Sequence, residues 1–188
     1  MVIINDRHVS VRLHEDILEE VYGKIAIHVM YDDDKIREVV MIDEEDIVRT
    51  YALSLKRKSW RFHPEIEQVN KQIRNGAAIG QAFRSAGFAI ERRLIDAYQV
   101  TTPLWLQAAF MNDTPVARAR TIEVSVEKYG KPYSYAIITE IYTPHFFRVE
   151  GPESKIIHIE PNSKNLALVA RAKTAMYLQQ HLPGRVLC

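Results

Sequence analysis

Hydrophobic and polar residues alternate in short segments through the first third of the chain. In the segment 24–31, Ile25, Ile27 and Val29 recur at every second position, which is the period of a strand with one buried face. Two further segments, 36–42 and 47–55, are rich in apolar and β-branched residues, and acidic turns separate the three segments. The pattern predicts three strands joined by short turns.

After residue 63 the apolar residues recur at the period of a helix. Pro64 suits the first turn of a helix, and the apolar residues that follow at spacings of three and four fall on one face: Ile66, Val69 and Ile73. Asn75 and Gly76 end this helix. A second, shorter helix is predicted over 77–86, ended by Gly87.

Strand-like segments return beyond Gly87. They cover residues 88–99, 104–110, 115–126 and 133–143. A final helix is predicted from residue 162 or 163 to His181, because apolar residues form one stripe there and Pro183-Gly184 follow. Strands joined by short turns, with helices grouped between them, are typical of an α+β domain built on an antiparallel sheet.

The length of 188 residues corresponds to one domain, with a core at about 24–147 and a C-terminal extension at 148–188. Apolar types make up 47% and charged types 26%, close to the average globular domain. A net charge of +1 provides no overall field for nucleic acid. The single cysteine, Cys188, fits a reducing compartment. No signal-peptide core or 18-residue apolar segment is present, so we expect a cytoplasmic protein without a membrane partner.

Motifs for the common cofactors are absent from the sequence. Neither of the glycine-rich phosphate-binding motifs occurs, and histidine and cysteine never fall at metal-ligand spacing. The nucleophile motif G-x-S-x-G is also missing. The basic cluster 56–58 near Trp60 is interpreted as a solvated loop rather than a nucleic-acid site. We therefore expect a protein that uses no cofactor and no metal.

Two charged residues interrupt apolar strand patterns. Arg49 shares a strand face with Tyr51 and Leu53, and a guanidinium in a core needs an anion beside it. Glu140 is the only ionisable carboxylate between residues 133 and 147, where burial would raise its pKa and suit it to donate a proton or bind a hydroxyl. Three interpretations remain open. Arg49 and Glu140 could pair with each other, or either could face solvent at a sheet edge. They could instead line a cavity for a small, doubly negative acid.

Three other arginines are less informative at this stage. Arg37 begins a strand beside Glu38, and the local pattern does not show which of the two faces inward. Arg118 and Arg120 share one face of a later strand, where an exposed stripe is the simpler interpretation.

Four short motifs occur in a characteristic order. They are I-R-E-V-V at 36–40, V-R-T at 48–50, A-I-G at 78–80, and V-A-R-A-R followed by Y-G-K-P and I-T-E-I-Y across 116–142. In this order and spacing they resemble the chorismate lyase (chorismate–pyruvate lyase) family, over roughly residues 36–147. The resemblance implies a six-stranded antiparallel sheet with helices packed on one side.

The resemblance also implies an activity and the residues that carry it. The activity is the cofactor-free elimination of pyruvate from chorismate to give 4-hydroxybenzoate. Glu140 would contact the ring hydroxyl of the substrate and assist elimination. Arg37 and Arg49 would hold its carboxylates, and the backbone N–H of Ile79 would donate to one of them.

The chain departs from the family pattern in three places. Ala78 replaces a proline, the segment before Arg37 is short and cannot be aligned with the family's N-terminal helix, and about 40 residues follow residue 147. The C-terminal helix could cap the cavity, form a dimer face or pack on the sheet. These departures keep two alternatives open: a related lyase or cyclase acting on another cyclic acid, and a module that binds a small carboxylate without converting it.

Overall fold

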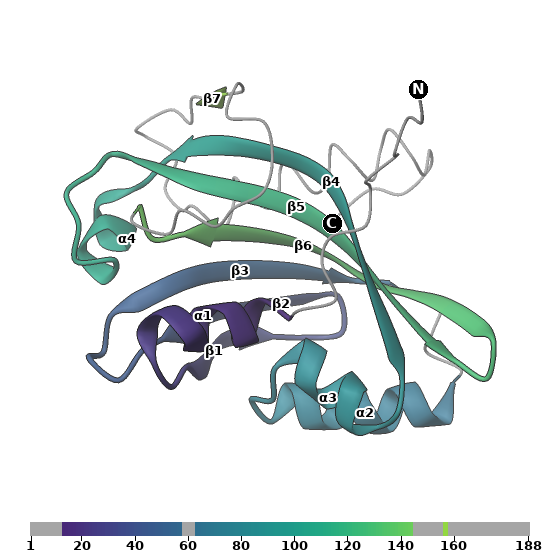
Figure 1. Cartoon of the computed structure of the whole chain (residues 1–188). Helices are drawn as coiled ribbons and strands as arrows, with labels where there is room; N and C mark the ends of the chain where they lie inside the picture. Colours follow the sequence, from purple (N-terminus) through teal and green to yellow (C-terminus); the bar gives the residue numbers. More distant parts are fainter. Residues whose placement is uncertain (1–12, 58–62, 145–155, 158–188) are drawn as a thin grey trace, which may run out of the picture.

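The fold is built on one curved antiparallel sheet, which the computed structural model describes over residues 13–57, 63–144 and 156–157 (Figure 1). Its strands are β1 (Ala26–Asp32), β2 (Ile36–Ile42), β3 (Val48–Lys56), β4 (Ala89–Thr101), β5 (Val116–Lys128) and β6 (Lys131–Tyr142). The order across the sheet is β1-β2-β3-β6-β5-β4, and every neighbouring pair is antiparallel. The two-residue strand β7 (Ile156–Ile157) adds to β4 in parallel. The predicted α+β class with a six-stranded antiparallel sheet is therefore confirmed.

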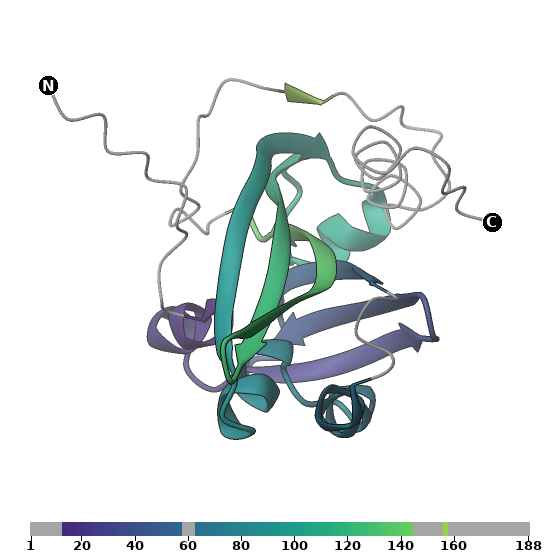
Figure 2. The same cartoon turned by 90° about the vertical axis from the view of Figure 1, so that its right-hand side faces the viewer.

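Within the described residues, four helices accompany the sheet: α1 (His14–Tyr22), α2 (Pro64–Arg74), α3 (Ile79–Ser85) and α4 (Leu104–Ala109). Figure 1 shows α2 and α3 together at one end of the sheet and α4 at the opposite end. Figure 2 shows that the sheet bends, so that β4–β6 stand at a steep angle to β1–β3. The predicted C-terminal helix at 162–181 lies outside the described residues.

Apolar residues are buried on both faces of the sheet. On one face, side chains such as Val39, Ala52 and Ile138 pack against the buried stripe of α2 and against Phe83 of α3. Helix α1 covers the same face, because its Leu18 packs on Met41 and Tyr142, which follow the same alternation. The opposite face carries another cluster, which includes residues of α4. Helices therefore cover both faces, whereas the resemblance implied helices on one side.

The segment 104–110 is a helix, and the prediction of a strand there was wrong. Pro103 precedes the first turn of α4, and its carbonyl oxygen accepts hydrogen bonds from the backbone N–H groups of Leu106 and Gln107. Leu106 and Phe110 lie four residues apart, and both are buried against the sheet. Apolar residues at positions 104, 106 and 110 also fit the two-residue period of a strand, so the short segment was ambiguous.

The residues before β1 form α1, an element that the sequence analysis did not predict. The side chain of Asp16 accepts a hydrogen bond from the backbone N–H of Leu13, which secures the start of the helix. Gly23 follows the last turn with a positive φ of 78°, a conformation that favours glycine. Within the described residues, no helix has the length and apolar character needed to span a membrane.

Candidate functional site

A cavity lies between the sheet, the start of α1 and the start of α3. Its volume is about 480 Å³, with its open mouth included. Its walls are mainly apolar and include Val39, Ala52 and Ile138 from the sheet. Five polar or charged residues also line it: Glu15, Arg37, Ser54, Arg92 and Glu140. Apolar walls with a few convergent polar groups are typical of a small-molecule site.

Glu140 lies on β6 near the middle of the sheet and is 2% exposed. The guanidinium of Arg120 donates from Nε to Glu140 Oε2 at 2.7 Å, and Arg92 donates from Nη2 to Glu140 Oε1 at 2.8 Å. The hydroxyl of Tyr142 donates to Oε2 at 2.5 Å. Three charged or polar donors from three positions therefore fix the carboxylate in one orientation.

These donors also decide the charge of Glu140. Burial on its own would raise the pKa of this carboxyl, but Arg120 and Arg92 outweigh burial and hold the pKa well below its usual range. Glu140 is therefore a carboxylate at neutral pH. The expectation that burial would raise the pKa of Glu140 and suit it to donate a proton was wrong, because Arg92 and Arg120 beside it were not anticipated. The other expectation, a hydrogen bond with a hydroxyl, stays a prediction.

Arg37 is the second predicted residue that lines the cavity. It lies on β2, is 2% exposed and donates from Nη2 to the carbonyl oxygens of Ile73 and Ala77, at 3.1 and 3.2 Å. Its Nε lies 3.4 Å from Asp32 Oδ2, and Asp32 also forms an ion pair with Lys56. Arg37 thus connects the cavity wall to the turn between α2 and α3.

Arg49 lies away from the cavity. Its Nε donates to Asp43 Oδ2 at 2.6 Å, and its guanidinium covers the ring of Tyr22 at 4.2 Å. Arg49 does not line the cavity, and it does not pair with Glu140. The prediction that the two residues share a site was wrong, because Asp43 in the preceding turn provides the anion that the Arg49 guanidinium needs.

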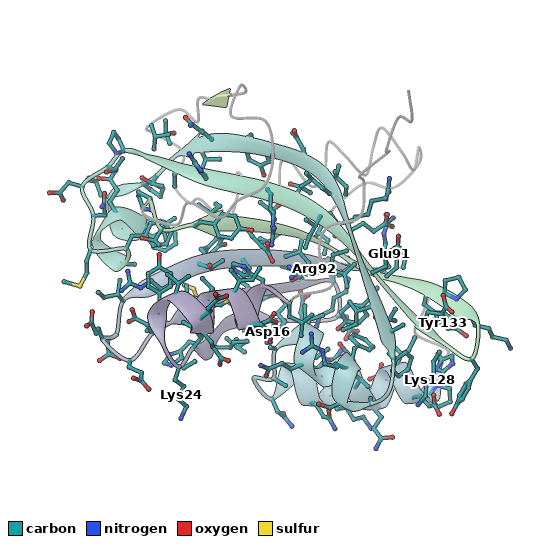
Figure 3. The ribbon with its side chains drawn as sticks, viewed as in Figure 1. Asp16, Lys24, Glu91, Arg92, Lys128 and Tyr133 are labelled. Atoms are coloured by element: carbon teal, nitrogen blue, oxygen red, sulfur yellow. The ribbon has the colours of Figure 1, made fainter. Side chains whose placement is uncertain are left out.

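Arg120 is buried at 7% exposure, so its assignment to an exposed stripe was wrong. It lies on β5 directly opposite Glu140 in the register of β5 and β6, inside the sheet rather than at its edge. Arg92, which sequence analysis did not single out, lies on β4 in the charged segment Glu91-Arg92-Arg93. Figure 3 shows Arg92 near the end of α1 that carries Asp16. Because three charged residues follow one another in this segment, the sequence does not show that Arg92 is the one that lines the cavity.

Helix α1 brings two further titratable residues to the same region. Glu15 lines the cavity at 7% exposure. His14 is 1% exposed, its Nε2 lies 3.0 Å from the hydroxyl of Thr50, and its ring packs edge-on against Tyr142. Burial lowers the pKa of His14 to about 3, so the imidazole is neutral at neutral pH.

Ile79 lines the cavity as the first residue of α3, next to Gly80. The structure therefore brings Glu140, Arg37 and Ile79 to one cavity and leaves Arg49 outside it. Among the described residues, no three side chains of histidine, cysteine, aspartate or glutamate are grouped to hold a metal ion.

No protein-family model matches the chain. A search of the curated proteins finds no match either.

Proposed function

We propose that the protein is a cofactor-free lyase that eliminates pyruvate from chorismate and releases 4-hydroxybenzoate. The observation that carries the proposal is the Glu140 carboxylate, held by Arg92 and Arg120 in a cavity that Arg37 also lines. Apolar walls suit a six-membered ring, and the arginines suit the two carboxylates of the substrate. The ordered motifs between residues 36 and 142 support the same family.

Arg92 takes the place that the resemblance gave to Arg49. Arg92 lines the cavity, and its side chain is 10% exposed. Arg37 and Arg92 then hold the two carboxylates from different strands. The backbone N–H of Ile79 donates to a carboxylate, as the resemblance implies.

The reaction needs orientation more than chemical assistance. The bond between the ring carbon and the enolpyruvyl oxygen breaks, the adjacent ring carbon loses its hydrogen, and the methylene carbon of the side chain gains one to give pyruvate. Atoms and electrons balance without water or an oxidant, and aromatisation of the ring drives the reaction. Fixed arginines in a poorly hydrated cavity stabilise the separating charge.

Within this mechanism Glu140 accepts a hydrogen bond from the ring hydroxyl. A carboxylate is an acceptor only, and the low pKa keeps Glu140 in that form. Glu140 therefore orients the hydroxyl-bearing carbon and stabilises positive character that develops on the ring. It does not supply the proton.

The first test is to incubate the purified protein with chorismate and to measure 4-hydroxybenzoate and pyruvate together. We expect equal amounts of both products. Arg92→Gln should lower turnover at low substrate concentration by at least tenfold, because one carboxylate contact is lost. Arg93→Gln is the matched control, since Arg93 is the next residue on β4 and binds Glu123 instead. Absence of both products with wild-type protein would contradict the lyase assignment.

A non-catalytic binding protein for a small acid is the second candidate. The three hydrogen bonds to Glu140 favour it, because they already hold the carboxylate in one orientation and leave Oε1 to accept a hydrogen bond from a ligand without any reaction. Thermal stabilisation by chorismate or 4-hydroxybenzoate without turnover would support this candidate. If the protein shows no turnover of chorismate and no thermal stabilisation by either compound, the result would favour a lyase or cyclase that acts on another cyclic acid.

A further inference from the structure

Glu15 is a second carboxyl in the cavity, contributed by a different element from Glu140. It is the second residue of α1, and its side chain faces the cavity with only 7% of the residue exposed. Neither the motifs nor the mechanism proposed above assigns it a role. A buried carboxyl that faces a cavity needs a physical explanation, because burial without a hydrogen-bonding group is costly.

The surroundings of Glu15 differ from those of Glu140. Within the part of the chain that the structure describes, no arginine or lysine forms an ion pair with the Glu15 carboxyl. The charged groups that act on it through space are Arg92 from β4, Glu140 from β6 and Asp16 from its own helix. Arg37 from β2 also acts on it through space. Arg92 donates from Nη2 to Glu140, and it forms no ion pair with Glu15.

This environment makes the Glu15 carboxyl easier to protonate than a glutamate in water. Burial raises the pKa of Glu15, and its own backbone N–H and the charge of Arg92 compensate only in part. The two carboxyls of the cavity are therefore driven in opposite directions, one toward the acid and the other toward the carboxylate. Pairs of this kind divide donor and acceptor roles in binding and catalytic sites.

We propose that Glu15 is the protonated carboxyl of this cavity and that it donates a hydrogen bond to a carboxylate of the bound acid. The proposal rests on the carboxylate ligand proposed above, and it adds a donor on α1 to the arginines on the sheet. A protonated acid can donate to a carboxylate, whereas an ionised one repels it. Binding therefore requires Glu15 to keep its proton.

The consequence is a link between ligand affinity and pH. As pH rises through the pKa of Glu15 in the free protein, the ligand must bind against a growing fraction of ionised Glu15. Affinity for a carboxylate should then fall by up to tenfold per pH unit. Glutamine at position 15 cannot ionise, and its amide N–H can still donate to a carboxylate.

The test is a calorimetric titration with 4-hydroxybenzoate from pH 5 to 8 for wild type, Glu15→Gln and Glu19→Gln. Glu19 lies on the exposed side of the same helix, so its variant is the matched control. We expect affinity to fall with pH in wild type and in Glu19→Gln, and to be unchanged in Glu15→Gln. A flat wild-type profile, or the same slope in Glu15→Gln as in wild type, would overturn the proposal.

A second measurement separates this proposal from the proposed function. If 4-hydroxybenzoate binds to none of the three proteins, the assigned ligand is wrong, and the donor role toward it is lost with it. The state of Glu15 is then read from carboxyl-carbon NMR of the ligand-free protein. A signal that is absent in Glu15→Gln and titrates above the ordinary value of 4.5 supports a protonated Glu15. Titration at or below that value would overturn it.

Discussion

Arg120 and Glu140 occupy directly paired positions on the neighbouring strands β5 and β6, and their side chains meet on the cavity face of the sheet. Both strands lie inside the sheet, so the backbone positions of the two residues are fixed by hydrogen bonds on both sides. The ion pair is therefore formed between two side chains whose backbone positions are rigid. This rigidity is what holds the Glu140 carboxylate in place without a ligand.

Glu140→Gln should destabilise the protein as well as impair its activity. The substitution leaves Arg92 and Arg120 buried without their carboxylate, and breaking a buried pair typically costs about 3–5 kcal/mol. Urea unfolding of the ligand-free protein measures this loss in the free energy of unfolding. Turnover of chorismate should fall further than the folded fraction alone explains.

The matched control for this variant is Glu123→Gln on β5. Glu123 also pairs with an arginine, Arg93, whose side chain is 45% exposed, and its other oxygen lies 3.7 Å from Arg57 and accepts a hydrogen bond from Ser134. The control should cost less than Glu140→Gln, because water screens the pair with Arg93 and the amide of glutamine can still accept from Ser134. Equal losses in the two variants would show that the arginines around Glu140 are already hydrated and that its carboxylate is not essential to the fold.

Tyr142→Phe should cost more stability than Tyr98→Phe. Tyr142 donates to the charged Glu140, whereas the hydroxyl of Tyr98 shares a neutral hydrogen bond with Thr121 at 3.1 Å. Hydrogen bonds to charged groups contribute about 1.5–3 kcal/mol, and neutral ones about 0.5–1.5 kcal/mol. Both rings are buried, so chemical unfolding compares the two hydroxyls directly. The reverse order would contradict an ionised Glu140.

Much of the sheet was predictable from the sequence because its strands alternate and its turns are distinctive. The acidic turn at 32–34 and the glycine turn at Tyr129-Gly130 both separate strands where expected. The prediction for segment 104–110 failed because the apolar pattern of a short segment fits both the period of a strand and that of a helix. Helix α1 was missed although Ile17, Leu18, Val21 and Tyr22 recur at helical spacing, because the helix is short and Leu13 at its start is not a residue type that marks a helix N-terminus.

The candidate site was predictable only in part, for a different reason. Glu140 stands alone among apolar residues, so its inward position can be read from the strand pattern. Arg92 lies next to Arg93, and Arg120 shares a strand face with Arg118, so only the pairing of β4, β5 and β6 shows which arginines come close to Glu140. The placement of Arg49 in the site was wrong because its ion-pair partner, Asp43, lies in a turn, and the strand pattern carries no information on turn residues.

His14 should make the stability of the protein depend on pH between 5 and 7.5. Its pKa is about 3 in the folded protein and about 6.5 when unfolded, so the unfolded chain binds the extra proton as pH falls below 6.5. The contribution of His14 to stability is therefore lost as pH falls, by about 2 kcal/mol between pH 7.5 and pH 5, whereas the raised pKa of Glu15 acts in the opposite direction. Glu140 adds a further loss only below the unfolded pKa of a glutamate, because its folded pKa is depressed.

His14→Gln isolates this effect from the other titratable groups. The difference in unfolding free energy between wild type and His14→Gln should shrink by about 2 kcal/mol as pH falls from 7.5 to 5. His28→Gln is the control, because His28 lies on the exposed edge strand β1 and His14 is retained. A difference between wild type and His14→Gln that stays constant with pH would show that the imidazole is accessible to protons in the folded state.

Gly80→Ala should destabilise the wild-type protein but stabilise a protein in which Leu13 is shortened to alanine. A Cβ at position 80 would lie 2.6 Å from Leu13 Cδ2, so the two elements that frame the cavity, α1 and α3, are in contact there. In wild type the overpacking should cost about 1–3 kcal/mol. In a Leu13→Ala background the contact is gone, and the higher helix propensity of alanine should contribute up to about 1 kcal/mol. Urea unfolding of the four proteins measures both effects. Destabilisation of the same size in both backgrounds would show that Leu13 is not what requires glycine at this position.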